Sequence, residues 1–126
     1  MKNVLLFIVS IILLTLFSFW SVLIATEKII RGKATDSYFF ECAIAVDVLG
    51  NIMGQHLWNS IFIADEGYQF GKRGETMSSV LGKNKRDNTL ITLGKTLANI
   101  LDTFQKNHCL ISIIEWIKTL FTTGIA

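Results

Sequence analysis

The sequence VLLFIVSIILLTLFSFWSVLIA, residues 4–25, is an uncharged apolar run that follows Met1, Lys2 and Asn3. In a helix, twenty-two residues at about 1.5 Å each span about 33 Å, which is enough to cross the hydrocarbon core of a bilayer. Trp20 lies near the end of the run, where aromatic side chains gather at a membrane interface. We therefore predict a transmembrane helix at 4–25, preceded by an N-terminal flank, 1–3.

A cleaved secretory signal is the alternative interpretation of this run. Such a signal has an apolar core of about 7–15 residues, followed by small residues at the cleavage site. Here the core is longer, and Leu23 and Ile24 stand just before Ala25, where a signal would carry small residues. The pattern favours an uncleaved, single-pass anchor over a signal.

Basic residues flank the run on both sides and bear on its orientation. Lys2 and the terminal amine precede it, whereas Lys28, Arg31 and Lys33 follow it. The positive-inside rule then favours a cytoplasmic C-terminal domain, by three charges against two. In that compartment both cysteines are expected to be free thiols, although an oxidising compartment would permit one disulfide.

The composition fits an all-α membrane protein. Hydrophobic residues make up 51% of the chain and charged residues 17%, against about 25% charged in typical soluble domains. The chain has no proline and few alternating, strand-like segments, so we expect helices throughout. After a polar connector at 26–37, residues 38–126 are predicted to form a small α-helical, membrane-proximal domain of three to five amphipathic helices.

The first helix of this domain is expected at 38–58. Asp47, Asn51 and Gln55 recur every four residues and form one narrow polar stripe on an otherwise apolar helix. The run 57–64 continues the apolar face of this helix.

Glycines at 67, 71 and 74 predict a loop after this helix. Thr76 or Ser78 is expected to cap a short helix, and Gly82 to end it. Asp87 or Asn88 is expected to cap the next helix, at 89–106. Its apolar residues have the spacing of a core-facing stripe; they are found at positions 90, 93, 97, 100, 101 and 104.

The last helix is expected at 109–123, after a break at 107–108. Its polar residues form a thin line on an apolar surface, and Glu115 and Lys118 argue against an ordinary membrane span. This helix either completes a bundle with the others or lies in the membrane interface.

The sequence holds no pattern that favours catalysis, a metal site or a cofactor. The tripeptide Gly94-Lys95-Thr96 resembles the end of a phosphate-binding loop, but Thr89 stands where that loop needs its first glycine. The histidines and cysteines lack the short spacings of common zinc sites. His108 and Cys109 are adjacent, so on a helix their side chains point about 100° apart. We therefore expect no enzyme, metal or cofactor.

A cluster of basic residues is the better candidate for binding. It consists of Lys72, Arg73, Lys83, Lys85, Arg86 and Lys95. The alternative is a solvated, solubilising loop. If the cluster binds, anionic lipid headgroups are expected ahead of nucleic acid, because the anchor holds the domain near a bilayer.

Two short motifs resemble those of a group of small phage and prophage proteins. The stretch from Glu75 to Lys83 is similar to the E-T-x-S-S-x-x-G-K signature of that group, and Leu101 to Cys109 is similar to its downstream D…H-C motif. The resemblance implies an origin in phage or mobile elements, and it implies that the two motifs pack together. The polar motif cluster expected from it is Glu75, Thr76, Ser78, Ser79, Asp102, His108 and Cys109.

These observations lead to an expected function in the bacterial inner membrane. We expect a non-enzymatic, membrane-anchored phage or prophage accessory protein that modifies host entry, superinfection or lysis. Its expected partners are lipid, another copy of the chain or a host envelope protein. The alternative is a structural subunit of a membrane-associated homo-oligomer. A third possibility is an enzyme that uses the Ser, Glu, His and Cys of the polar motif cluster.

Overall fold

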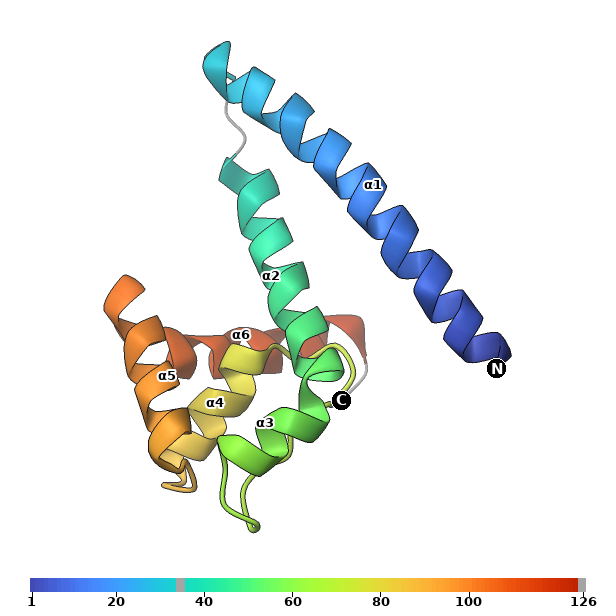
Figure 1. The fold of residues 1–126 in the computed structure, drawn as a ribbon. Coiled ribbons are helices and arrows are strands. Elements are labelled where there is room, and N and C mark those ends of the chain that lie inside the picture. The colour runs from blue at the N-terminus through green and yellow to red at the C-terminus, as the bar shows by residue number, and fades with distance from the viewer. Residues whose placement is uncertain (34–35, 125–126) are drawn as a thin grey trace. The chain divides into compact units, whose positions relative to one another are not determined.

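The computed structural model describes residues 1–33 and 36–124, and the elements in this part of the chain are α-helices (Figure 1). The helices are α1 (Lys2–Ile30), α2 (Asp36–Met53), α3 (Gln55–Ile61), α4 (Met77–Arg86), α5 (Thr92–Phe104) and α6 (His108–Thr123). The predicted fold class, a long apolar N-terminal helix followed by a small helical domain, is confirmed. The chain divides into two compact units, Met1–Cys42 and Ala43–Ala126.

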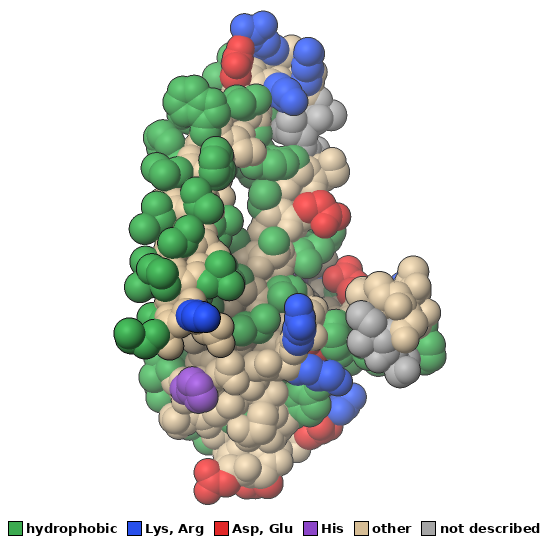
Figure 2. Space-filling model, turned by 90° about the vertical axis from the view of Figure 1, so that its right-hand side faces the viewer, with side chains coloured by type: hydrophobic (Ala, Val, Ile, Leu, Met, Phe, Trp, Pro, Cys, Tyr) green, Lys and Arg blue, Asp and Glu red, His purple; other side chains and the backbone are tan. Residues whose placement is uncertain are grey.

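The first unit consists mainly of α1, which contains the whole predicted anchor, 4–25. This helix of 29 residues is long and apolar enough to cross a membrane. Its hydrophobic side chains face outward along its length (Figure 2). The hydroxyls of Ser10 and Thr15 each donate a hydrogen bond of 2.8 Å to the carbonyl four residues earlier. The helix thus satisfies these polar groups internally, as a lipid environment requires.

The second unit is built around α4, which packs chiefly against α6 and also against α5. Its Val80 and Leu81 are fully buried. Burial of such side chains contributes roughly 1.5–3 kcal/mol each. They belong to one hydrophobic cluster that draws on most elements of the unit: Ile63, Phe70, Val80, Leu81, Leu90, Ala98 and Cys109.

Gly82 lies inside α4 and does not end it, so the prediction of a helix end at this residue is wrong. The helix continues to Arg86, and the chain then turns at Asn88, whose φ of 57° is left-handed. Gly82 is needed for close packing, because a Cβ there would lie 2.0 Å from the carbonyl oxygen of Cys109 in α6. The start of α4 agrees with one predicted alternative: the Thr76 hydroxyl accepts a hydrogen bond of 3.1 Å from the Ser79 N–H.

The predicted helix at 89–106 is too long at both ends. Residues 89–91 pair instead with the segment after α3: the Ala64 N–H donates to the Thr89 carbonyl at 2.9 Å, and the Ile91 N–H donates to the Phe62 carbonyl at 3.0 Å. Because this pairing is extended, α5 begins only at Thr92, and neither Asp87 nor Asn88 caps it.

The boundaries of two further helices also differ from the prediction. The expected helix at 38–58 breaks at Gly54, and α3 then runs only to Ile61. The Trp58 indole N–H spans the break by donating to the Gly50 carbonyl at 3.0 Å. At the other end of the domain, His108 opens α6.

The predicted core-facing stripe of α5 is only partly right: Leu97 and Leu101 pack against the hydrophobic cluster, but the other large apolar side chains of the helix face outward. Leu93, Ile100 and Phe104 are 56%, 50% and 87% exposed, whereas Gly94 and Ala98 are buried. The physical reason is close packing. The small residues Gly94 and Ala98 let α5 approach the neighbouring segments closely, and the large residues on another face of the helix stay exposed.

Helix α6 carries an outward stripe of its own. Its exposed members are Leu110, Ile114, Ile117 and Phe121. Their spacing of four, three and four residues matches that of Leu93, Leu97, Ile100 and Phe104 in α5, of which Leu97 is half-buried against the hydrophobic cluster and the other three are exposed. Residues at this spacing share one face of a helix. We call these two sets the outer stripes.

We predict that Gly82→Ala destabilises the protein by about 1–3 kcal/mol, because the added methyl group would overlap the backbone of α6. Chemical denaturation of the detergent-solubilised full chain, followed by circular dichroism, measures this loss. Gly50→Ala is the matched control, since a Cβ at Gly50 meets nothing within 4 Å. Equal stability of the two variants would contradict this account of the contact between α4 and α6.

Candidate functional site

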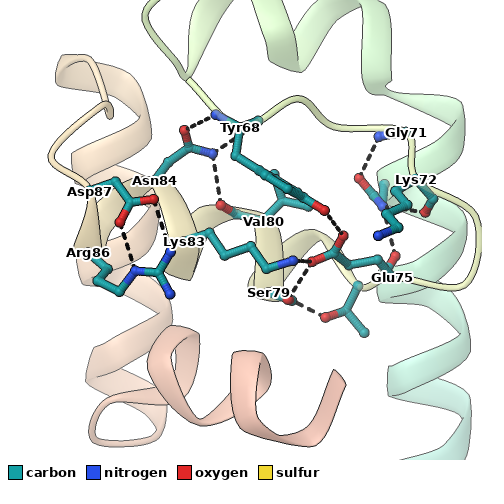
Figure 3. A network of polar contacts seen from close by, with 12 residues as sticks. Tyr68, Gly71, Lys72, Glu75, Ser79, Val80, Lys83, Asn84, Arg86 and Asp87 are labelled. Carbon is teal, nitrogen blue, oxygen red and sulfur yellow. Dashed lines mark hydrogen bonds and ion pairs between the residues drawn. The ribbon is translucent and has the colours of Figure 1, made fainter. Parts of the chain in front are cut away.

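The carboxylate of Glu75 is fully buried and lies at the centre of a polar network (Figure 3). It accepts hydrogen bonds from the Tyr68 hydroxyl at 2.9 Å, the Ser79 hydroxyl at 2.7 Å and the Lys83 ammonium at 2.5 Å. The Lys83 Nζ also lies 4.1 Å from the centroid of the Tyr68 ring. The buried negative charge is therefore surrounded by three donors, one of them cationic.

The spacing of this network along the chain explains how it forms. Ser79 and Lys83 are four residues apart in α4 and share one face of the helix, and Glu75 lies just before the N-cap residue Thr76. Tyr68 reaches the same carboxylate from the loop before the helix. Burial and the hydrogen bond to Glu75 both raise the pKa of Tyr68, which keeps its phenol protonated and donating.

Two asparagine side chains hold that loop by hydrogen bonding to its backbone N–H and carbonyl groups. Asn84 accepts from the Tyr68 N–H at 2.8 Å and donates to the Tyr68 carbonyl at 2.8 Å. Asn59 contacts Phe70 in the same way, at 2.7 and 3.4 Å. Each amide thus satisfies both backbone groups of one loop residue, as a neighbouring strand would.

A third asparagine, Asn51 of α2, binds the part of the loop nearest to α4. It donates to the carbonyls of Lys72 at 3.1 Å and Glu75 at 2.8 Å, and it accepts from the Gly71 N–H at 2.9 Å. One turn earlier, the Asp47 carboxylate accepts from the Ser78 N–H at 3.2 Å. A negative group at a helix N-terminus is stabilising there.

A second group of polar residues joins the starts of α4 and α6. Ser78 Oγ lies 3.2 Å from His108 Nε2, and His108 Nδ1 lies 2.8 Å from Gln105 Oε1. At the same end of α6, Asp102 accepts from the Cys109 N–H at 3.2 Å and from the Lys85 ammonium at 2.5 Å.

Two pKa shifts follow from the surroundings of Asp102 and Cys109. Burial would raise the pKa of Asp102, but hydrogen bonds from Lys85 and Cys109 outweigh it and lower that pKa. Burial, assisted by the Asp102 charge, raises the pKa of Cys109 to about 12. The Cys109 side chain is thus a neutral thiol at physiological pH, which makes it a poor nucleophile. Cys42 and Cys109 are both free.

The structure places the seven residues of the predicted polar motif cluster in two groups. Glu75, Thr76 and Ser79 surround the start of α4. The contact between Ser78 and His108 joins the two motifs, with Asp102 and Cys109 beside it. Sequence reasoning did not assign Tyr68, Asn59 or Asn84 to the site. The spacing of Asp47 and Asn51 at i, i+4 could have identified them as site residues, because Asn51 contacts the loop and Asp47 contacts the start of α4.

The order Ser78, His108, Gln105 resembles that of a nucleophile, a base and an orienting group. Two observations favour a packing role over a catalytic one. Ser78 is only 3% exposed. Its backbone N–H, which could otherwise help to stabilise an oxyanion, is bonded to the carboxylate of Asp47. We read the contact as a polar link between α4 and α6.

The six residues of the predicted basic cluster do not form one continuous cationic surface. Lys83 points inward to Glu75, and Lys85 pairs with Asp102. Arg86 pairs with Asp87 at 2.7 Å, and the Lys72 Nζ lies 5.8 Å from the centroid of the Trp116 ring. Within the described ranges, Arg73 and Lys95 take part in no ion pair.

We predict that Glu75→Gln destabilises the folded domain by about 3–5 kcal/mol, because it leaves the Lys83 charge largely buried without a counter-charge. Denaturant melts of the solubilised full chain measure the loss. Asp87→Asn is the matched control: it removes a carboxylate from the exposed pair with Arg86, and exposed ion pairs contribute little to stability. A Glu75→Gln variant as stable as Asp87→Asn would contradict the central role of the buried pair.

Comparison with known proteins gives no further assignment for this network. No protein-family model matches the chain, and neither a curated protein nor a solved structure matches it. The resemblance of the two motifs to small phage proteins therefore stays a prediction from sequence.

Proposed function

We propose that this chain is a non-enzymatic, membrane-anchored accessory protein of phage or prophage type that acts at the bacterial cell envelope. In this proposal α1 spans the inner membrane once, and the helical unit lies in the cytoplasm. The protein acts by binding and thereby changes host entry, superinfection or lysis. Its partner is a host envelope protein or the membrane surface.

The observation that carries this proposal is the contrast between the interior and the surface of the second unit. Each buried polar residue there has a hydrogen-bond partner; these residues are Asn51, Glu75, Ser78, Ser79, Asn84 and Ser112. The outer stripes, in contrast, present large apolar side chains to the surroundings. Exposed apolar patches of this kind commonly mark interaction sites.

A structural subunit of a homo-oligomer is the alternative function. The outer stripes favour it through their spacing, because apolar residues four, three and four positions apart form the seam of helix-to-helix contacts. Cross-linking in membranes separates the two functions: a ladder of discrete oligomers supports assembly, and a monomer or a hetero-complex supports the accessory role. An enzyme that uses Ser78 and His108 is the third candidate, which labelling of Ser78 by a fluorophosphonate would support.

We predict that a double substitution in the α5 stripe, Leu93→Ser with Phe104→Ser, abolishes the accessory phenotype and leaves the fold intact. Substitutions of exposed side chains that make no buried or capping contact usually change the free energy of unfolding by at most about 0.5 kcal/mol each. The measurement is phage plating efficiency and lysis time in cells that express the full chain. Thr96→Ser with Thr103→Ser, on the polar face of α5, is the control. An unchanged phenotype in a well-expressed Ser double variant would contradict the proposal.

We predict that a cysteine at residue 65 is cytoplasmic. Asp65 is exposed in a loop, and Cys109 can stay in place because its buried thiol reacts poorly. In a Cys42→Ser background, an impermeant maleimide should label Asp65→Cys only after lysis. Asn3→Cys, on the other side of the anchor, should react in spheroplasts. The reverse pattern would show that the orientation is wrong and would leave the anchor itself unaffected.

A further inference from the structure

A pocket of about 250 Å³ lies between the end of α4 and one face of α5. Its lining consists of Lys85, Asn88, Leu90, Lys95, Ala98 and Asn99. Lys95, Ala98 and Asn99 share a face of α5, because they stand at i, i+3 and i+4. Lys85 belongs to the last turn of α4, and Asn88 to the left-handed turn that follows.

The lining combines polar donors with an apolar base. Leu90 and Ala98 are buried and belong to the hydrophobic cluster of the domain. The exposed or half-exposed members are two lysines and two asparagines, whose ammonium and amide groups are donors. A ligand in this pocket would therefore meet hydrogen-bond donors from two helices and the turn between them, together with a small apolar surface.

The charges of the lining select an anion. The Lys85 charge is compensated, since its Nζ lies 2.5 Å from the Asp102 carboxylate. Lys95 forms no ion pair within residues 1–33 and 36–124, so its ammonium leaves the pocket with a net positive charge. Lys118 and Lys106 also lack ion pairs in these ranges, but neither lines the pocket.

We propose that this pocket binds a phosphate ester. A phosphate group has several acceptor oxygens that point in different directions, and it can accept from Lys95, Lys85 and the amides of Asn88 and Asn99. Lysine is a common phosphate ligand because it supplies a compact charge on a flexible stem. The apolar base, Leu90 and Ala98, suits the carbon atoms next to an ester oxygen better than it suits a bare inorganic ion.

Such a phosphate ester has two sources, a phospholipid headgroup and a soluble metabolite. The lipid source rests on the proposed function, because it needs the second unit to lie beside the bilayer that holds α1. The soluble source does not depend on the anchor. The two sources are distinguished by asking whether a phospholipid headgroup competes with a soluble phosphate ester for the pocket.

The test uses the full-length protein in micelles of a maltoside detergent, which carries no phosphate, titrated with glycerol phosphate and followed by calorimetry at constant ionic strength. We expect saturable binding that Lys95→Gln weakens about tenfold, which is the effect of losing one charged hydrogen bond. Lys118→Gln, an equal change of charge on α6, should bind as the unchanged protein does. Circular dichroism melts of both variants check that the fold is kept.

Each outcome bears on the proposal. Absence of saturable binding, or equal weakening by Lys95→Gln and Lys118→Gln, overturns it, because binding would then be absent or would reflect overall charge. If binding is confirmed, the titration is repeated in nanodiscs that contain phosphatidylglycerol. A lower apparent affinity for glycerol phosphate there supports the headgroup as ligand. An unchanged affinity supports a soluble phosphate ester and leaves the proposed membrane anchoring unaffected.

Discussion

The buried carboxylate of Glu75 is the constraint on which the rest of the second unit depends. An isolated ionised carboxylate in an apolar interior is very costly, so this one has to be paired and hydrogen-bonded. The donors that satisfy it come from two places, Ser79 and Lys83 on α4 and Tyr68 on the preceding loop. Because these groups must converge on one point, the carboxylate sets the position of the loop relative to the helix. Removal of one partner from such a buried pair is strongly destabilising, because the other charge is left uncompensated.

The packing of α4 follows from the same position. With Glu75, Ser79 and Lys83 on one side, the apolar Val80 and Leu81 face the hydrophobic cluster, and Gly82 faces α6. The close contact at Gly82 brings the start of α6 against α4, where Ser78 meets His108. Polar and apolar contacts thus support a single arrangement of α4 and α6. This agreement between polar and apolar contacts is what allows a short sequence to specify one structure.

Sequence reasoning predicted the helices well because their signals are local. Apolar runs, the Thr76 cap and the glycine-rich loop each depend on a few neighbouring residues. The Asp47 and Asn51 stripe was also visible as a periodicity, and it does contact the loop and α4. The helix end predicted at Gly82 and the N-cap predicted at Asp87 or Asn88 both failed because of contacts with distant segments. At Gly82 the backbone of α6 approaches closely, and residues 89–91 pair with the segment after α3 instead of starting a helix.

The candidate site was less predictable because its contacts are distant in sequence. Asn59 and Asn84 bind residues 11 and 16 positions away, through backbone groups that no motif identifies. The orientation of α5 was hidden for a related reason. Gly94 and Ala98 turn inward because their small size permits a close approach: a Cβ at Gly94 would lie 2.2 Å from the Phe62 carbonyl oxygen, whereas Leu93 and Phe104 stay outside.

The loop before α4 has no regular backbone ladder of its own, and this affects the order in which the domain folds. Its shape is supplied by amides from three helices: Asn51 of α2, Asn59 of α3 and Asn84 of α4. The loop therefore becomes ordered only once those helices have met, and a slight separation of any one of them would release it. Its susceptibility to proteolysis is thus a sensitive measure of helix assembly, including changes too small to alter the helical content of the chain.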